Sequence, residues 1–327
     1  MIWNQWHAVL ESKEVKNNRI IGVTRMGEKL VFWRDKDGEI ACLWDKCAHR
    51  GVALSIGKII DGEIQCPFHG LQYDGTGKCT VIPSRGRATE VPENFKVHQY
   101  PARDRHGMIW IWWGDPLSEY PPLPFFENID KSFDYATHVC RWSVHYSRAI
   151  ENQLDVSHLP FVHHDTIGRG GKTVCDGPYV EANEVELKAW VMNRKDDGTP
   201  SLLPKDVNKP KGGVKLHFKY PNVWQLDLSP DGKVVAFFTP VDEENTVIYL
   251  RFYQKFVKIP GLKQLITRLS MLFNNKVLHQ DRHVVLTEIP KKTAYKMKEN
   301  LFPADKPIME YRRYRHELKE KNKPVTA

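Results

Sequence analysis

Two short Cys–His pairs constrain this chain more than any other feature of its sequence. The first pair is Cys47-Ala-His49, and the second, after sixteen intervening residues, is Cys66-Pro-Phe-His69. Thiolates and imidazoles at such spacings are typical metal ligands. A glycine follows each pair, at positions 51 and 70, and glycine allows a loop to turn tightly beneath a bound group. The segment therefore predicts a metal centre between two loops.

The distribution of the four side chains separates two kinds of metal centre. A zinc finger usually places its two cysteines in one pair and its two histidines in the other. Here each pair contains one of each, which suits a [2Fe–2S] cluster with two thiolates on one iron and two imidazoles on the other. A zinc site, or four residues that only pack in turns, are the alternatives.

A second group of candidate ligands lies in residues 151–163, ENQLDVSHLPFVH. Asp155 and His158 are three residues apart and share a face if the segment is helical, whereas His158 and His163 are five apart. We expect Pro160 to interrupt the helix and thereby to bring both imidazoles to one point. Two histidines and a carboxylate form the facial triad of non-haem Fe(II) oxygenases. Taken alone, however, these histidines fit hydrogen-bonded core residues equally well.

The first Cys–His group lies in a region of short strands. Alternating apolar and polar residues, separated by turn residues, occur over 19–45, 58–65, 71–82 and 107–113. A proline-rich stretch at 116–126 follows and indicates a linker. We therefore expect an all-β domain over residues 1–115.

The second group lies in a region of mixed character. We expect a helix over 144–165, strands within 178–256, and further helices over 261–288 and 306–322. The predicted fold class is α+β, in which residues 116–327 form an antiparallel sheet flanked by helices. No glycine-rich nucleotide loop or internal repeat is present.

Composition places the chain among globular proteins. Hydrophobic residues make up 41% and charged residues 27% of the chain, enough to form a core. No run of 18 apolar residues predicts a membrane span, and the N-terminus lacks the basic and apolar segments of a secretory signal. The six cysteines are too sparse for a disulfide scaffold. A cytoplasmic location without membrane association is expected.

The net charge of +8 is concentrated near the C-terminus. Residues 251–327 contain 18 Lys and Arg against 7 Asp and Glu. A solvated helical face explains this excess better than nucleic-acid binding, because no Gly/Arg-rich or aromatic-interleaved basic motif accompanies it. A basic surface of this kind can also attract an acidic protein partner.

Both groups resemble motifs of one family. CAHRG…CPFHGLQYDGTGKC resembles the Rieske motif, C-x-H followed by C-x2-H, in the form found in aromatic-ring-hydroxylating and demethylating oxygenases. This likeness covers about residues 3–115. The run at 152–163 resembles the N-x-x-D-x-x-H-x4-H signature of the catalytic domains of Rieske non-haem iron oxygenases. The resemblance implies a [2Fe–2S] cluster on Cys47, His49, Cys66 and His69.

The same resemblance implies roles for the second group. His158 and His163 become ligands of a mononuclear Fe(II), while Asn152 and Asp155 become catalytic residues. Asp155 is then no ligand but the bridge between the two metal centres. His164 departs from the x4 spacing and is expected to be only a neighbour.

The third iron ligand in this family is a carboxylate on a late helix. The segment QDRHVVLTE at 280–288 is the best match, which selects Asp281 and leaves Glu288 as the competing candidate. The resemblance also implies a helix-grip-like catalytic domain. It further implies a head-to-tail homotrimer, in which Asp155 bonds His158 of its own chain and His69 of the neighbouring subunit.

The implied protein is the terminal oxygenase component of a multicomponent system. It uses O2 and NAD(P)H-derived electrons delivered by a separate reductase, with or without a ferredoxin. The length of the chain is closest to that of vanillate- and dicamba-O-demethylase-type enzymes. We therefore expect mono-oxygenation, as hydroxylation or O- or N-demethylation, of a small aromatic or cyclic substrate. The alternatives are aromatic cis-dihydroxylation and, in a different class, an electron-transfer Rieske protein without catalytic iron.

Overall fold

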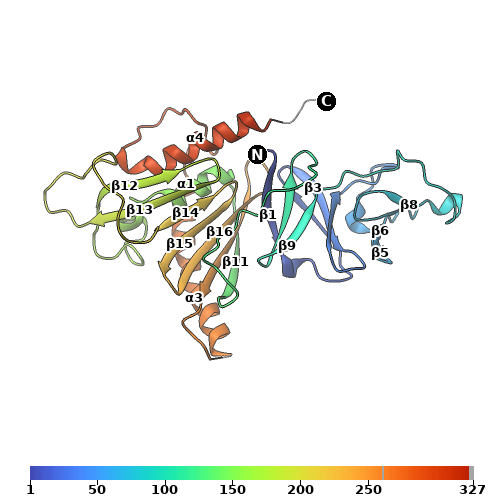
Figure 1. Ribbon diagram of the computed structural model, residues 1–327, viewed down its shortest axis with the longest axis horizontal. Coiled ribbons are helices and arrows are strands. Elements are labelled where there is room, and N and C mark those ends of the chain that lie inside the picture. Colours follow the sequence, from blue (N-terminus) through green and yellow to red (C-terminus); the bar gives the residue numbers. More distant parts are fainter. Residues whose placement is uncertain (260, 324–327) are drawn as a thin grey trace. The chain divides into compact units, whose positions relative to one another are not determined.

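The computed structural model describes residues 1–259 and 261–323, which form two compact units (Figure 1). The first unit holds Asn4–Leu117 together with Pro240–Asp242. The second holds Met1–Trp3, Ser118–Thr239 and the described residues from Glu243 onward. Each of the two groups of candidate ligands lies entirely within one unit.

The first unit consists of three small sheets, as the alternating pattern predicts. Their strand orders are β1-β10-β9, β2-β3-β4 and β5-β6-β7-β8. The strands are β1 (Gln5–Glu11), β2 (Ile21–Arg25), β3 (Glu28–Arg34), β4 (Ile40–Trp44), β5 (Lys58–Ile60), β6 (Glu63–Gln65), β7 (Gln72–Tyr73), β8 (Cys79–Val81), β9 (Ala102–Arg105) and β10 (Met108–Trp113).

Tight turns set the register of the hairpins in this unit. Met26 and Gly27 connect β2 to β3 with φ values of 52° and 85°, and Asp61 and Gly62 connect β5 to β6 in the same way. Two successive positive φ angles match the twist of the flanking strands, and glycine adopts the second without steric cost.

The second unit is built on a seven-stranded antiparallel sheet with the order β11-β17-β16-β15-β14-β13-β12. Its strands are β11 (Asp134–Trp142), β12 (Val174–Ala182), β13 (Glu186–Arg194), β14 (Leu216–Lys219), β15 (Val223–Ser229), β16 (Gly232–Pro240) and β17 (Thr246–Gln254). The sequence did not predict β11. This edge strand is mostly polar, and its buried residues, Cys140 and Trp142, lie at its end, so the alternation is too short to indicate a strand.

Among the residues described, the α-helices that accompany the sheet are α1 (Tyr146–Leu154), α2 (Leu159–Val162), α3 (Leu262–Val285) and α4 (Lys306–Lys321). The long helix α3 packs on β11 and β17, while α4 packs on β12 and β13 (Figure 1). The expected α+β class is thus confirmed. Across residues 1–259 and 261–323, no helix combines the length and apolar character that crossing a bilayer requires.

The helix expected over 144–165 is divided, but not where the sequence suggested. The first part, α1, ends at Leu154, and Asp155 directly after it is extended, with φ −69° and ψ 128°. Pro160 is the second residue of α2 and does not interrupt it, because a proline in the first helical turn leaves no backbone bond unmade. The prediction that Asp155 and His158 share a helical face is therefore wrong. They lie on either side of the break, Asp155 after α1 and His158 before α2.

Candidate metal centres

Two matching loops present the Cys–His pairs of the first unit. In one loop the Gly51 N–H donates to the carbonyl of Cys47, and in the other the Gly70 N–H donates to that of Cys66. Both glycines adopt positive φ, 73° and 74°, as the loop prediction requires. The Cys47 thiol also contacts the buried Tyr73 hydroxyl at 3.2 Å. The two loops therefore share one geometry, each closed on itself by a glycine.

The four side chains divide into a buried pair and an exposed pair. Cys47 and Cys66 are 3% and 2% exposed, and their thiols interact with each other. Burial raises the pKa of the Cys66 thiol, while backbone N–H groups directed at the sulfur oppose this shift. His49 and His69 are exposed, and their Nδ1 atoms approach to 3.2 Å. Thiols therefore meet on the inner side and imidazoles on the outer side.

This separation bears on the choice between zinc and an iron–sulfur cluster. One tetrahedral zinc ion needs all four donors at about 2.0–2.3 Å from a single point. Among the described residues, the groups of three or more donors within 4.8 Å of one another lie elsewhere in the chain. Two thiols on one side and two imidazoles on the other fit a two-iron cluster with mixed ligation.

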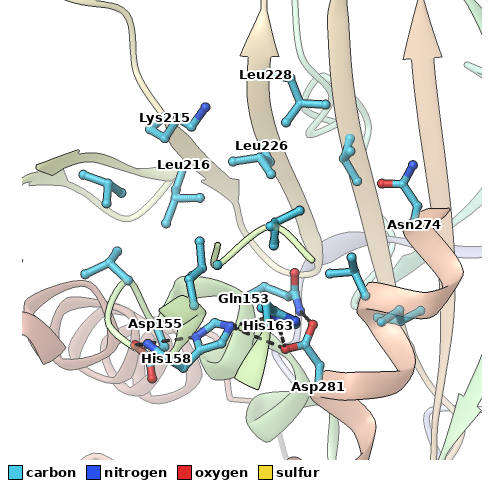
Figure 2. A pocket seen from close by; sticks show the side chains of 18 of the residues that line it. Gln153, Asp155, His158, His163, Lys215, Leu216, Leu226, Leu228, Asn274 and Asp281 are labelled. Atoms are coloured by element: carbon cyan, nitrogen blue, oxygen red, sulfur yellow. Dashed lines mark hydrogen bonds and ion pairs between the residues drawn. The ribbon is translucent and has the colours of Figure 1, made fainter. Parts of the chain in front are cut away.

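The second unit brings two histidines and an aspartate together (Figure 2). His158 Nε2 lies 3.3 Å from His163 Nε2, and Asp281 Oδ1 lies 3.4 Å and 3.0 Å from these two atoms. Neighbouring ligands of an octahedral ion bound at about 2.1 Å lie about 3.0 Å apart, so the three atoms fit one face of such an ion. The remaining positions would stay open to other ligands.

The position of the two histidines at the ends of a one-turn helix explains how residues five apart can converge. His158 immediately precedes α2 and His163 immediately follows it. Asp281 comes from α3, more than a hundred residues later, and is 2% exposed. The donor group therefore depends on the packing of α2 against α3.

Two amides hold the Asp281 carboxylate in place. Asn152 Nδ2 donates to Asp281 Oδ1 at 3.2 Å, and Gln153 Nε2 donates to Oδ2 at 3.1 Å. Gln153 also donates to the Asn152 oxygen at 2.7 Å. Asn152, predicted as catalytic, thus contacts a candidate ligand, whereas the contact of Gln153 was not anticipated from the sequence.

A further amide orients His163, also without a sequence signal. The Gln280 Nε2 group donates to Asp165, so its Oε1 is the acceptor that faces His163 Nδ1 at 2.9 Å. The Thr166 hydroxyl donates to the same oxygen. Because the Gln280 oxygen requires a proton on Nδ1, Nε2 is the nitrogen of His163 that can bind a metal, and it faces Asp281 and His158.

Asp155 lies beside His158 but outside the three-atom group. Its Oδ1 accepts hydrogen bonds from the Ser157 backbone N–H and hydroxyl, and lies 3.7 Å from His158 Nδ1. His158 Nδ1 is buried and has no partner within hydrogen-bond distance in the described part of the chain. The side chain of Asp155 is 27% exposed, so it can contact another chain as well as His158.

The competing candidates lie elsewhere. Glu288 forms an ion pair with Arg148 at 3.1 Å and is absent from the donor group. His164 is exposed, with Nδ1 at 3.0 Å from the Phe161 carbonyl. The geometry therefore favours Asp281 over Glu288 and agrees with His164 as a neighbour.

The group opens into a cavity of about 590 Å³ (Figure 2). Most of its wall is apolar, and the strands β13 to β17, the loop after α2 and the helix α3 all contribute. A few polar groups interrupt this surface, among them Asn193, Lys215 and Asn274. A cavity of this size and character suits a small, largely apolar organic molecule.

Comparison with known proteins agrees with this two-part arrangement. Residues 5–101 match the Rieske [2Fe-2S] domain, and residues 142–321 match the vanillate O-demethylase oxygenase C-terminal domain. A Rieske domain followed by this oxygenase domain defines the oxygenase component of the Rieske non-haem iron oxygenases. The chain belongs to this family, whose cofactors are a Rieske [2Fe–2S] cluster and a mononuclear iron.

Individual relatives show how far the similarity extends. The chain is 36% identical over 168 residues to chlorophyllide a oxygenase of Chlamydomonas reinhardtii, covering 51% of this chain and 25% of the relative. It is 32% identical over 207 residues to the oxygenase component of dicamba O-demethylase from Stenotrophomonas maltophilia, covering 61% and 58%. The chain spans 25% to 61% of the length of the first curated relatives it matches.

Solved structures share the fold. NdmA of Pseudomonas putida CBB5 superposes with a TM-score of 0.77 at 24% identity, covering 97% of this chain and 90% of NdmA. At this identity the likeness supports the same fold. It does not identify a substrate.

Proposed function

We propose that this chain is the terminal component of a multicomponent oxygenase that mono-oxygenates a small aromatic or cyclic compound, by hydroxylation or by O- or N-demethylation. The observation that carries the proposal is the three-donor group at the base of an apolar cavity of about 590 Å³. The similarity to the oxygenase component of dicamba O-demethylase supports demethylation.

The candidate ligands form two separate metal centres in this proposal. Cys47, His49, Cys66 and His69 would hold the [2Fe–2S] cluster, and His158, His163 and Asp281 would hold the iron. When bound, these groups supply stored electrons and an open-sided Fe(II) able to activate O2. The protein contributes the fixed direction of each imidazole and a largely apolar wall that keeps water from the substrate.

Asp155 links this chain to another subunit in the proposal. Its carboxylate faces His158 Nδ1 and is partly exposed, while His69 is exposed on its loop. In a head-to-tail homotrimer Asp155 would bond His158 of its own chain and His69 of the neighbouring subunit. NAD(P)H-derived electrons would enter through a reductase, with or without a ferredoxin, because no nucleotide-binding motif is present in this sequence.

A product assay with a surrogate reductase tests the proposal. The iron-loaded protein is supplied with NADH, O2 and a panel of methoxylated, N-methylated and unsubstituted aromatic compounds. Formaldehyde released in proportion to substrate consumed supports demethylation, and a phenol or alcohol supports hydroxylation. A cis-diol product would show instead that the enzyme is a dihydroxylating dioxygenase.

Substituting Gln280 by leucine is expected to weaken Fe(II) binding about tenfold to hundredfold, because His163 loses the acceptor that fixes its tautomer. Competition with a chelator under anaerobic conditions measures the affinity. Thr166→Val is the control, since it removes a donor to Gln280 but leaves the Gln280–His163 contact, and it should cost less. Equal losses in both variants would contradict the role given to Gln280.

Iron binding should also depend on pH. Burial alone would lower the pKa of His158, but Asp155 and Asp281 raise it to about 9. The metal-free chain therefore holds a proton on His158 that a metal must displace. Fe(II) affinity should rise about tenfold per pH unit from about pH 7 to about pH 9 and then level off. A flat affinity profile, measured by the same competition, would contradict this.

The stability of the metal-free protein should fall with rising pH, whereas its Fe(II) affinity should rise. A histidine whose pKa is raised on folding stabilises the folded state fully below its unfolded value of 6.5, and this contribution disappears as the pH rises through about 9. The melting temperature of iron-free protein should therefore fall over this range. His158→Gln should remove most of that fall.

A further inference from the structure

We propose that His138, Cys140 and His279 form a second metal-binding site, for a borderline-soft divalent cation such as Zn²⁺. One donor atom from each of these residues lies within 4.8 Å of the other two. Apart from the group of His158, His163 and Asp281, this is the remaining set of three such donors among the described residues. Neither the family signatures nor the proposed function uses these residues.

The fold brings the three residues together from two elements. His138 and Cys140 are two apart on the edge strand β11, so their side chains leave the same face of the sheet. His279 comes from α3, which packs on β11. A bound ion would therefore fasten an edge strand to the helix that carries Asp281.

The new site is separate from the proposed iron site. His279 and Asp281 are two apart on α3, and residues two apart on a helix point in widely different directions. Asp281 is buried against the two histidines, whereas His279 is exposed. The two donor groups thus lie on different sides of one helix.

The side chains suit zinc better than iron. Two imidazoles and a thiolate are favoured ligands of Zn²⁺, and a solvent molecule can complete the tetrahedron. A site of nitrogen and sulfur donors binds Zn²⁺ more tightly than Fe²⁺. Cys140 is 7% exposed and His279 is exposed, so a cation can reach the thiol from the surface.

The polar surroundings also support a ligand role. Asn275 lies one turn before His279, on the same face of α3. Its Oδ1 is buried and has no hydrogen-bond partner among the described residues. An acceptor in this position can receive the N–H of a metal-bound His279, the kind of contact that orients metal ligands.

Zinc uptake by the iron-loaded protein tests the proposal. The protein is equilibrated with buffered free Zn²⁺ and desalted, and both metals are measured per chain by mass spectrometry. Wild type should take up about one zinc without losing iron. His279→Ala and Cys140→Ser should each weaken uptake at least about tenfold. His283→Ala, an exposed histidine on the same helix, is the matched control and should bind as wild type does.

Two further measurements keep the outcome decisive. Zinc X-ray absorption should show one sulfur and two imidazole nitrogens, and zinc should raise the melting temperature of wild type but not of His279→Ala. Zinc uptake matched by an equal loss of iron would place the ion at the proposed iron site and overturn the proposal. Unchanged uptake in His279→Ala, which alters a surface residue and should fold, would also overturn it.

Discussion

Replacing Asp281 by alanine is expected to lower the iron content from about three atoms per chain to about two and to abolish oxygenation. Among the described residues, Asp281 supplies the only carboxylate oxygen in the group of His158 and His163, at 3.4 Å and 3.0 Å from their Nε2 atoms. Two imidazoles alone hold Fe(II) too weakly to keep it through purification. The cluster, in the other unit, should keep its visible and EPR spectra.

Glu288→Gln is the matched control for this experiment. Glu288 is paired with Arg148 and contacts neither histidine in the donor group. This variant should retain about three irons per chain and measurable turnover. Loss of one iron from Glu288→Gln, together with full retention in Asp281→Ala, would reverse the assignment of the third ligand.

Asp155→Asn should retain both iron centres yet lose at least about a hundredfold in turnover. The asparagine side chain has the same shape and can still accept from Ser157, so the local turn should persist. Asparagine lacks the negative charge of the aspartate. In wild type this charge faces His158 and, in the proposed trimer, also His69 of the neighbouring subunit. Iron analysis, cluster EPR and product formation with a surrogate reductase are the measurements.

A kinetic comparison distinguishes a bridging role from a general loss of stability. In Asp155→Asn the reductase should still reduce the cluster, whereas oxidation of the reduced cluster by O2 and substrate should slow in parallel with turnover. Asp196→Asn, an exposed turn residue in the same unit, should behave as wild type. Full activity of Asp155→Asn with both centres loaded would exclude the bridging role.

The two Cys–His loops were the most predictable part of the molecule. Their four side chains lie within 23 residues, each loop closes on itself, and each needs a glycine at a defined place. Such local geometry follows from spacing and residue type. The division of the loops into a buried thiol pair and an exposed imidazole pair required the fold, because it depends on which side packs into the core.

The helix break shows how a local rule can point to the wrong residue. Pro160 was expected to interrupt a helix, yet it lies in the first turn of α2, and the chain leaves helical geometry at Asp155 instead. Proline is excluded from a helix interior but accepted in its first turn, and the sequence pattern does not distinguish these positions. The convergence of His158 and His163 was nevertheless anticipated, although the two histidines flank the short helix α2 and no break separates them.

The sequence by itself determined the family, the α+β class and the candidate ligands, because short motifs and alternation encode local geometry. Only the tertiary structure placed Asp281 rather than Glu288 beside the histidines, gave Gln153 and Gln280 their contacts, and brought His279 to β11. These groups come from segments far apart in the chain. Their proximity depends on how α3 packs against α2 and the sheet. Local sequence patterns do not predict this packing.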